Sequence, residues 1–501
     1  MSNSRSKNAI RNIIFGYMAQ FGIIVLSFVG RKIFLQFLTI DYLGINGLYS
    51  NILTVLSLPE LGFDAAVLYS LYRPVAEDNK PLVYSMLRYF KKIYVVLAIT
   101  IFAIGIAITP FLKYIIDSNL PETDLIIYYI LFLTNTVASY FVGHKIVLLF
   151  AYQEQRIQKL ITLMTNFVLQ FVYIIVLIVW HNYYIYIAST VITTILNNII
   201  LNTICNKIHK DIFIKQKSIN FEKKIIIRNV SSTFLYKIGA VAINNTDNIL
   251  ISMLISTAAV GLYSNYYTVI GAVQGFIAII TNSLISGIGN LCVTDDKKKQ
   301  YEVFNMLLLF YHFIASLGAI GFGLLINDFI SIWLGSEYLF EQSIVIAIVL
   351  NFYITNAISP VWMYREANGL FNRVKYLMLL RAIINIILSI FMGKYWGVMG
   401  IFAATTVSLV LTSFWYEPSI LFKNIFGIPS KKYWLKQVKY FLVSTMCFII
   451  SRQIMSRLPD EITGFTLKAI IIIIINVSIF FVSCFKSDEV KRLKSILKIV
   501  R

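Results

Sequence analysis

Residues 464–484 read GFTLKAIIIIIINVSIFFVSC, an apolar run of twenty-one residues that contains one charge, Lys468. As an α-helix this run is about 30 Å long, which is the thickness of the hydrocarbon core of a bilayer. Similar apolar runs recur along the chain between polar or basic loops. They predict about fourteen transmembrane helices, at residues 12–38, 44–72, 93–112, 125–150, 160–180, 184–206, 229–254, 258–291, 303–326, 342–364, 376–393, 397–422, 440–456 and 464–484.

The composition of the whole chain supports this class of fold. Of its 501 residues 58% are hydrophobic and 14% are charged, and the mean hydropathy is +0.75. Soluble domains carry about 25% charged residues and have too much surface to hide so many apolar side chains. The basic start, MSNSRSKNAIRN, shows no cleavable signal peptide. We therefore expect an all-α, multi-pass membrane protein.

The distribution of basic residues predicts the orientation of the helices. With both termini placed in the cytoplasm, 34 of the 44 Lys and Arg residues lie in cytoplasmic tails and loops, and four lie at the outer ends of helices. This bias follows the positive-inside rule and predicts a protein of the inner, cytoplasmic membrane. The net charge of +20 then reflects topology. Nucleic acid is not an expected partner, because the basic residues are spread over many loops and do not form one face.

No residue pattern indicates catalysis or a bound cofactor. The four cysteines, Cys205, Cys292, Cys447 and Cys484, form no CxxC pair, and the four histidines form no metal-ligand cluster. The expected outer loops are short and hold no paired catalytic residues. We expect no metal, no cofactor and no enzymatic activity.

A short repeat divides the chain. GLYSNILTV (residues 47–55) and GLYSNYYTV (residues 261–269) match at seven of nine positions and open the second and eighth expected helices. Six helices separate the copies, so they have the same orientation, as in a parallel repeat. The expected parts are an N-lobe (1–206), a basic linker (207–228), a C-lobe (229–425), two further helices (426–485) and a basic tail (486–501). The linker is either an amphipathic stretch on the membrane surface or a solvated connection.

The seventh expected helix contains AINNTDNIL, residues 242–250. Its polar residues cover more than one helical turn, so some of them must face protein or water. We favour a local break in the helix that lines a cavity, because Asn and Asp compete with the backbone for hydrogen bonds. The alternative is a polar clasp between helices. The residues concerned are Asn244, Asn245, Thr246, Asp247 and Asn248.

Four basic residues lie within expected spans at positions that matter for function. Lys237 is too deep to reach the membrane surface, so it either pairs with an acid or faces an aqueous cavity. Arg31 faces a cavity or extends outward, and Lys32 points about 100° away from it. Arg381 lies about two turns from the cytoplasm, where extension to the surface competes with a functional role.

Two acidic residues lie in LPELGFDAA, residues 58–66. Pro59 and Gly62 predict a kink. Glu60 and Asp64 are four residues apart and share one face of the helix. They are candidate proton or cation sites, counter-ions for the cations of the first helix, or members of a structural ion-pair network.

Several of these motifs occur together, in order, in one known family. The chain resembles the Wzx-type polysaccharide-biosynthesis flippases of the multidrug/oligosaccharidyl-lipid/polysaccharide (MOP) exporter superfamily over most of residues 10–425. The motifs are the two GLYSN copies, ELGFDAAVLYSLYRP (60–74), NNTDNILIS (244–252), YREANGLFNRVKY (364–376) and WGVMGIFAATTVSLVLTSFW (396–415).

The resemblance implies two six-helix lobes in a V, with two C-terminal helices, that open alternately to each side of the membrane. It also implies a substrate, an undecaprenyl-pyrophosphate-linked oligosaccharide that moves from the inner to the outer leaflet. A diphosphate needs a cation in a water-filled cavity, because its charge cannot cross lipid unpaired. The expected substrate-binding residues are Arg31, Lys237, Asn244, Asn245, Asp247, Asn248 and Arg381, and the expected ion-coupling residues are Glu60, Asp64 and Asp247.

A cation-coupled multidrug antiporter of the same superfamily is the alternative function. Its pocket would be dominated by acidic and aromatic side chains and would need no cation. The expected partners are the lipid-linked oligosaccharide, membrane lipids, and a polysaccharide polymerase or glycosyltransferases, around a monomer. The glycan and the energy source are not readable from the residues.

Overall fold

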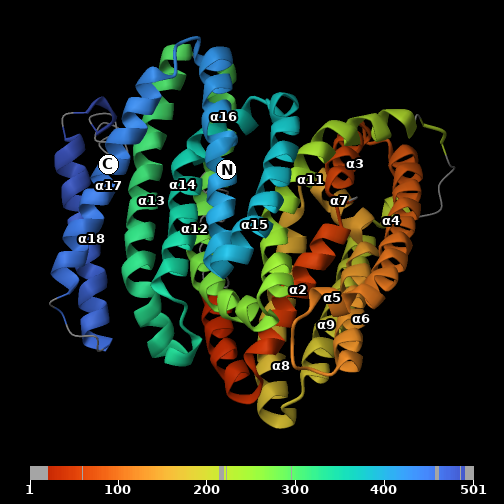
Figure 1. The fold of residues 1–501 in the computed structure, drawn as a ribbon. Helices are drawn as coiled ribbons and strands as arrows, with labels where there is room; N and C mark the ends of the chain where they lie inside the picture. Colours follow the sequence, from red (N-terminus) through yellow and green to blue (C-terminus); the bar gives the residue numbers. More distant parts are fainter. Residues whose placement is uncertain are drawn as a thin grey trace. The chain divides into compact units, whose positions relative to one another are not determined.

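The computed structural model describes residues 21–58, 60–213, 219–221, 223–294, 296–456, 458, 462–485 and 487–490. Throughout these residues the chain forms helices joined by short turns, and no strand occurs among them (Figure 1). Within the described ranges, ten helices are long and apolar enough to cross a membrane. Each of the fourteen expected spans has a helical counterpart. The prediction of an all-α, multi-pass membrane protein is therefore confirmed.

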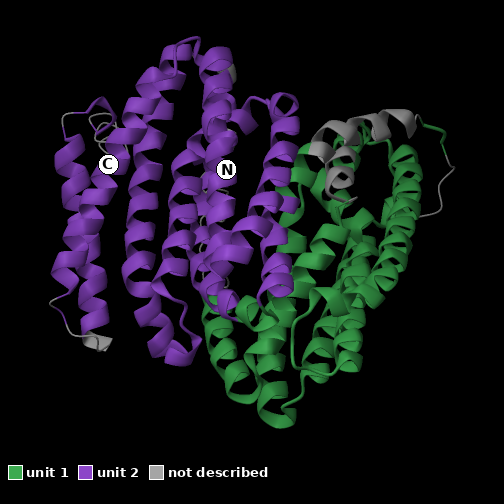
Figure 2. Ribbon diagram, viewed as in Figure 1, with its two compact units in different colours: residues 1–241, 256–261 green, residues 242–255, 262–501 purple. Residues whose placement is uncertain are grey.

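The helices form two compact units, which Figure 2 distinguishes by colour. The first unit holds residues 1–241 and 256–261. Within it α9 packs against both α8 and α6, and α6 packs against α4. Its main elements are a helix over 21–37, α2 (Ile40–Leu56), α3 (Glu60–Ala76), α4 (Lys80–Ile108), α6 (Glu122–Tyr140), α7 (Gly143–Ala151), α8 (Gln155–Trp180), α9 (Tyr183–Ile208) and the short α10 (Lys210–Phe213).

The second unit holds residues 242–255 and 262–501. Here α13 packs against α14, α17 and α18. The division between the units falls inside α11 (Lys223–Leu254), which follows the expected linker. The predicted boundaries of the lobes, the linker and the tail stay a prediction. The other elements are α12 (Thr257–Thr294), α13 (Lys297–Trp333), α14 (Gln342–Ala367), α15 (Phe371–Leu411), α16 (Ser413–Leu421), α17 (Lys431–Met455) and α18 (Ile462–Cys484).

Two features of the backbone agree with the helices expected from the sequence, and one contradicts them. The second expected helix is divided into α2 and α3, with a turn at residues 57–58; Pro59 lies outside the described residues. The eleventh and twelfth expected helices are joined in α15 across a kink at Gly397, whose φ of 59° and ψ of −141° suit glycine alone. The predicted break in the seventh helix is wrong, because α11 continues unbroken through residues 242–250.

Hydrogen bonds explain why α11 does not break at its polar stretch. The Thr246 hydroxyl donates to the carbonyl of Ala242, one turn earlier, at 2.7 Å. Asp247 accepts a hydrogen bond from another helix, as described below, and so does not compete for the backbone of its own helix. The Thr246 hydroxyl and one carboxylate oxygen of Asp247 thus have partners that are compatible with an intact helix.

The start of α12 packs closely against the start of α2 within the first unit. A Cβ atom on Gly44 would lie 2.0 Å from the carbonyl oxygen of Thr257, and one on Gly261 would lie 2.4 Å from the carbonyl oxygen of Ile40. The amide of Thr257 also donates to the carbonyl of Asp117 at 2.9 Å. Only glycine allows two helices to approach so closely. The crossing joins the helices that carry the two GLYSN copies.

Candidate functional site

The first unit contains a polar cavity of about 640 Å³. It is lined by the helix over 21–37 and by α2, α6, α8 and α9. Ten of its thirteen lining side chains are polar or charged, which is unusual for a helix bundle expected to lie in lipid. The lining residues are Arg31, Asn46, Ser50, Leu53, Thr54, Ser57, Phe132, Asn135, Thr136, Tyr173, Tyr186, Ile187 and Thr190.

One helical face of α2 supplies much of the polar wall. Asn46, Ser50, Thr54 and Ser57 recur at spacings of three and four residues, so their side chains stand above one another along the helix. The hydroxyls of Ser50 and Thr54 each donate to a carbonyl four residues earlier, at 2.7 Å. These bonds satisfy the hydroxyl protons within the helix and leave the oxygen lone pairs available to the cavity.

The opposite wall is held in place by tyrosines of α8 and α9. The ring of Tyr173 stacks on that of Tyr186, with centroids 4.0 Å apart and planes 20° apart. The hydroxyl of Tyr173 shares a hydrogen bond with Thr190 at 2.6 Å. A third tyrosine, Tyr183, donates to Oδ1 of Asn46 at 2.9 Å and so ties the two walls together. The aromatic and polar groups are therefore preorganised.

Arg31 gives the cavity its electrostatic character. It is the basic side chain among the lining residues, and the lining contains no acidic side chain. Its neighbour Lys32 is exposed, as the angle between adjacent helical residues predicts. Lys237 lies in the first unit too, half-buried in α11, but it does not line this cavity. A cavity with this lining favours an anionic, hydroxyl-rich ligand.

The remaining predicted binding residues lie in the second unit. Asn244 is exposed, whereas Asn245, Asp247 and Asn248 are half-buried on α11. Arg381 is 7% exposed on α15. The structure brings Asp247 and Arg381 close enough for a favourable electrostatic interaction. It thus brings near each other two residues that are 134 positions apart in the sequence.

A hydrogen-bonded chain surrounds Asp247. The amide nitrogen of Asn385 donates to the hydroxyl of Thr405 at 3.1 Å, and this hydroxyl donates to Oδ2 of Asp247 at 2.8 Å. The other carboxylate oxygen of Asp247 and the amide oxygen of Asn385 are buried without a hydrogen-bond partner among the described residues. Unpaired buried acceptors are costly, so this cluster is suited to take up a proton or a small cation.

The side chains of Glu60 and Asp64 lie outside the described part of the structure, although both residues belong to α3. The histidine, cysteine and acidic side chains that are described form no group able to hold a metal ion. Site assignments for all these residues stay predictions.

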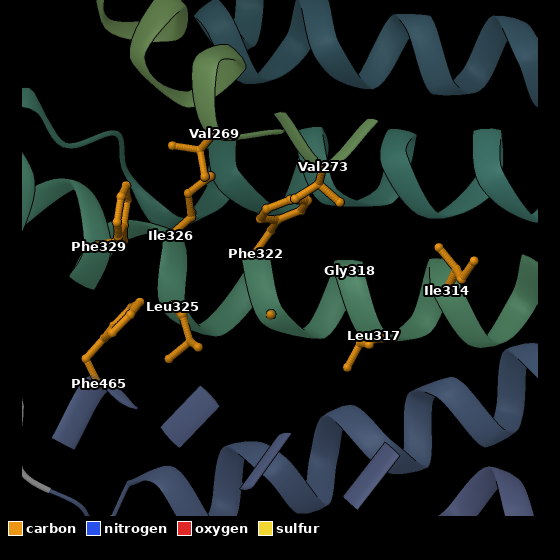
Figure 3. A pocket seen from close by; sticks show the side chains of 11 residues that line it. Val269, Val273, Ile314, Leu317, Gly318, Phe322, Leu325, Ile326, Phe329 and Phe465 are labelled. Atoms are coloured by element: carbon orange, nitrogen blue, oxygen red, sulfur yellow. The ribbon is translucent and has the colours of Figure 1, made fainter. Parts of the chain in front are cut away.

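An apolar groove of about 380 Å³ lies in the second unit (Figure 3). Side chains of α12, α13 and α18 form its walls, and α18 contributes Phe465. Its sides are aliphatic and aromatic throughout. The labelled residues are Val269, Val273, Ile314, Leu317, Gly318, Phe322, Leu325, Ile326, Phe329 and Phe465.

Sequence reasoning missed the polar wall of α2 and the partners of Asp247. The wall had a readable signal, because Asn46, Ser50 and Thr54 recur at helical spacing within and beside the first GLYSN copy. Asn385 and Thr405 are ordinary polar residues in apolar helices, and nothing in their spacing pairs them with Asp247. Their meeting is a property of the packing between α11 and α15.

Comparison with known proteins gives three results. The model of a family described as polysaccharide biosynthesis protein matches residues 9–285. The fold is similar to that of a structure titled lipid II flippase MurJ, inward closed conformation, with a TM-score of 0.69 and 14% sequence identity over 94% of this chain and 99% of that chain. No curated protein sequence matches this chain.

Two multidrug transporters share the fold as well. An inward-facing MATE family transporter of the MOP superfamily has a TM-score of 0.63 and 12% identity, over 79% of this chain and 93% of that chain. A mutant form of the Vibrio cholerae MATE transporter VcmN has a TM-score of 0.57 and 13% identity, over 85% of this chain and 100% of that chain. At these identities the likeness concerns the fold alone.

Proposed function

Because this chain belongs to the polysaccharide biosynthesis protein family, we propose that it flips a polyprenyl-pyrophosphate-linked oligosaccharide from the inner to the outer leaflet. The chain is a membrane flippase or transporter of the MOP type. The substrate, its direction and a mechanism of alternating access are the proposed part. On this proposal the protein has no enzymatic activity, since it moves its substrate without changing a covalent bond.

The observation that carries the proposal is the charge of the cavity in the first unit. Arg31 offers a planar guanidinium, which binds phosphate oxygens through paired hydrogen bonds. Hydroxyl and amide groups of α2 and α6 surround it and can bond to sugar hydroxyls. The stacked Tyr173 and Tyr186 add an aromatic surface that suits a sugar ring. The combination fits a phosphorylated glycan better than an apolar cation.

The apolar groove of the second unit supports a lipid-linked substrate. Its aliphatic and aromatic lining would receive a polyprenyl chain by the ordinary hydrophobic effect. A substrate with a charged head, a polar glycan and a long apolar tail needs both kinds of surface. The two units of this chain hold one of each.

The cluster at Asp247 is the proposed site of ion coupling. Its unpaired carboxylate and amide oxygens are hard ligands suited to a proton or sodium ion. Arg381 would compete with such an ion for Asp247, so ion binding and the Arg381 interaction would exclude each other. Glu60 and Asp64 remain further candidates for coupling. The remaining candidates for substrate contact are Lys237, Asn244, Asn245 and Asn248.

A cation-coupled multidrug antiporter is the competing proposal. The fold of the MATE transporters and the half-buried Asp247 favour it. The cavity of the first unit weighs against it, because a basic side chain would repel a cationic drug. The proposed setting is the inner membrane, with both termini in the cytoplasm. The protein would act there as a monomer beside a polysaccharide polymerase or glycosyltransferases.

The test is a flipping assay with the full-length protein in proteoliposomes. The substrate is a fluorescent polyprenyl-pyrophosphate oligosaccharide, and a membrane-impermeant quencher reports the leaflet. Arg31→Ala should lower the rate at limiting substrate about tenfold or more, since a hydrogen bond between charged groups contributes about 1.5–3 kcal/mol. Arg31→Lys should recover part of the rate. Lys32→Ala is the matched control, because Lys32 is exposed and does not line the cavity.

The same vesicles separate the two proposals. Uptake of ethidium driven by a proton or sodium gradient, together with unchanged glycan flipping in Arg31→Ala, would contradict the flippase and support the antiporter. Loss of flipping in Lys32→Ala to the same extent would show a general charge effect and would remove the argument from the cavity.

A further inference from the structure

A third pocket lies at the start of α17, and it shares no lining residue with the cavity or the groove described above. It measures about 590 Å³ and is lined by Pro429, Ser430, Lys431, Trp434, Leu435 and Val438. The helix that begins here is a candidate membrane span from Lys431 to Met455. The pocket therefore stands where a membrane helix meets the water interface. The pattern of basic residues predicts that this end is cytoplasmic.

The stretch of chain that forms the pocket is basic. Residues 422–440 read FKNIFGIPSKKYWLKQVKY and contain five lysines and no acidic residue. Lys436 is neutralised by an ion pair with Glu489. No ion pair with an acidic side chain is found for the exposed Lys431 anywhere in the described part of the chain. Within that part, the pocket thus presents a cation without its own counter-ion.

Trp434, which lines the pocket, belongs to an aromatic cluster. The ring of Trp434 lies 4.4 Å from that of Trp415 and 5.3 Å from that of Phe414, measured between centroids. Tryptophan side chains gather at the headgroup level of membranes, because one part of the indole is apolar and another donates a hydrogen bond. This cluster therefore suits a position at the level of the lipid headgroups.

The pocket continues into an apolar stripe on the same face of α17. Leu435, Val438 and Leu442 are 63%, 58% and 60% exposed. Their spacing from Lys431 is four, seven and eleven residues, so all four stand on one side of the helix. The opposite side of α17 is buried, and it includes Tyr433 and Tyr440. A ligand seated at Lys431 would therefore have an apolar surface running from it into the bilayer.

We propose that this pocket binds the headgroup of an anionic phospholipid, with one acyl chain along the stripe of Leu435, Val438 and Leu442. The lysine attracts the phosphate, the indole of Trp434 sets the depth, and the apolar stripe excludes a free anion as the preferred ligand. A soluble acidic peptide is disfavoured for the same reason, since the exposed Leu435, Val438 and Leu442 present an apolar surface beside the lysine. The site is separate from the cavity and groove of the proposed transport function and does not depend on them.

The test uses fluorescence quenching in vesicles that contain the full-length protein. Brominated phosphatidylglycerol or brominated phosphatidylcholine is added at equal mole fractions to a phosphatidylcholine membrane. We expect more quenching by phosphatidylglycerol, and the double change of Trp434→Phe with Trp415→Phe should abolish the excess, because these two neighbouring indoles report the same lipid. In a titration with brominated phosphatidylglycerol, Lys431→Gln should raise the mole fraction of this lipid at which the excess quenching is half-maximal. The expected increase is about fivefold, which corresponds to about 1 kcal/mol per basic residue at an anionic surface. Lys92→Gln, an exposed lysine of α4, should leave it unchanged.

Three outcomes would overturn the proposal. The first is equal quenching by the two lipids, which would show a surface without headgroup selectivity. The second is an excess that survives the double change of Trp434→Phe with Trp415→Phe, which would place the lipid elsewhere. The third is removal of the excess by inorganic phosphate but not by chloride at the same ionic strength, which would identify a site for a free anion. Because Lys431 is exposed, Lys431→Gln should fold normally, and an unchanged thermal unfolding temperature checks this.

Discussion

Replacement of Gly44 by alanine should destabilise the crossing between α2 and α12. The added Cβ would lie 2.0 Å from the carbonyl oxygen of Thr257, 2.8 Å from its carbonyl carbon and 2.9 Å from its Cγ2. Ordinary contacts between such atoms are about 3.5 Å. Because the closest atoms belong to the backbone, a rotamer change cannot relieve the overlap. The two helices would have to separate by more than an ångström.

The expected cost is about 1–3 kcal/mol, the usual range for overpacking of a closely packed site. For a unit of this size that corresponds to a fall of roughly 2–10 °C in the unfolding temperature. Gly261→Ala should act in the same direction, because its Cβ would lie 2.4 Å from the carbonyl oxygen of Ile40. Since both changes push apart the same pair of helices, the double variant should lose less than the sum of the two single effects.

Gly271→Ala is the matched control on α12. Its nearest neighbour beyond the helix backbone would be the Tyr267 ring at 3.8 Å, an ordinary contact. Alanine is the better helix former, so this variant should be unchanged or about 0.5–1 kcal/mol more stable. The measurement is thermal unfolding in detergent, followed by tryptophan fluorescence. Wild-type stability of both Gly44→Ala and Gly261→Ala would refute the close approach of these helices.

Two further predictions concern ion pairs. Glu417→Ala should destabilise the second unit by about 3–5 kcal/mol, because Arg365 would keep a buried charge without the carboxylate that now lies 2.6 Å away. The measurement is chemical unfolding, in which the double variant Glu417→Ala with Arg365→Met should recover most of the lost stability. No recovery in the double variant would contradict the explanation. The hydrogen bond and charge of Lys80 hold the pKa of Asp211 below its ordinary value, so the contribution of this pair is present above about pH 4 and is lost as the pH falls through that lowered pKa. Amide hydrogen exchange in α10, corrected for intrinsic rates, should therefore be faster at pH 3 than at pH 6. The variant Asp211→Asn should abolish this difference. Equal protection of the wild-type α10 at both pH values would show that the pair does not anchor this helix.

Much of the fold was predictable, because membrane insertion depends on local composition. Each stretch of about twenty apolar residues becomes a helix, since only a helix satisfies its own backbone hydrogen bonds in lipid. Run 464–484 illustrates this, as its helix α18 ends at Cys484, the residue predicted. The end of an apolar run was a poorer guide to where a helix begins or ends. The helix α17 begins at Lys431, nine residues before the expected span, because a helix can extend beyond the bilayer with charged residues on its surface.

The candidate sites were predictable only in part. An ionisable residue such as Arg31 or Asp247 is costly in lipid, so its position in an apolar run marks it without knowledge of any neighbour. Which groups meet these residues depends on how the helices pack. The sequence could not show that Asn385 and Thr405 reach Asp247, or that Lys237 stays outside the wall that contains Arg31.

The apolar pattern of this chain by itself determined a multi-pass helical membrane protein, because the transfer of each segment into lipid is a local free energy summed over about twenty residues. The tertiary structure decided the cavity around Arg31, the partners of Asp247, and the crossing of α2 and α12 at Gly44. These features depend on which faces of distant helices approach each other. Contacts of that kind are set by side-chain shape and by single hydrogen bonds, which leave no periodic signal along the chain.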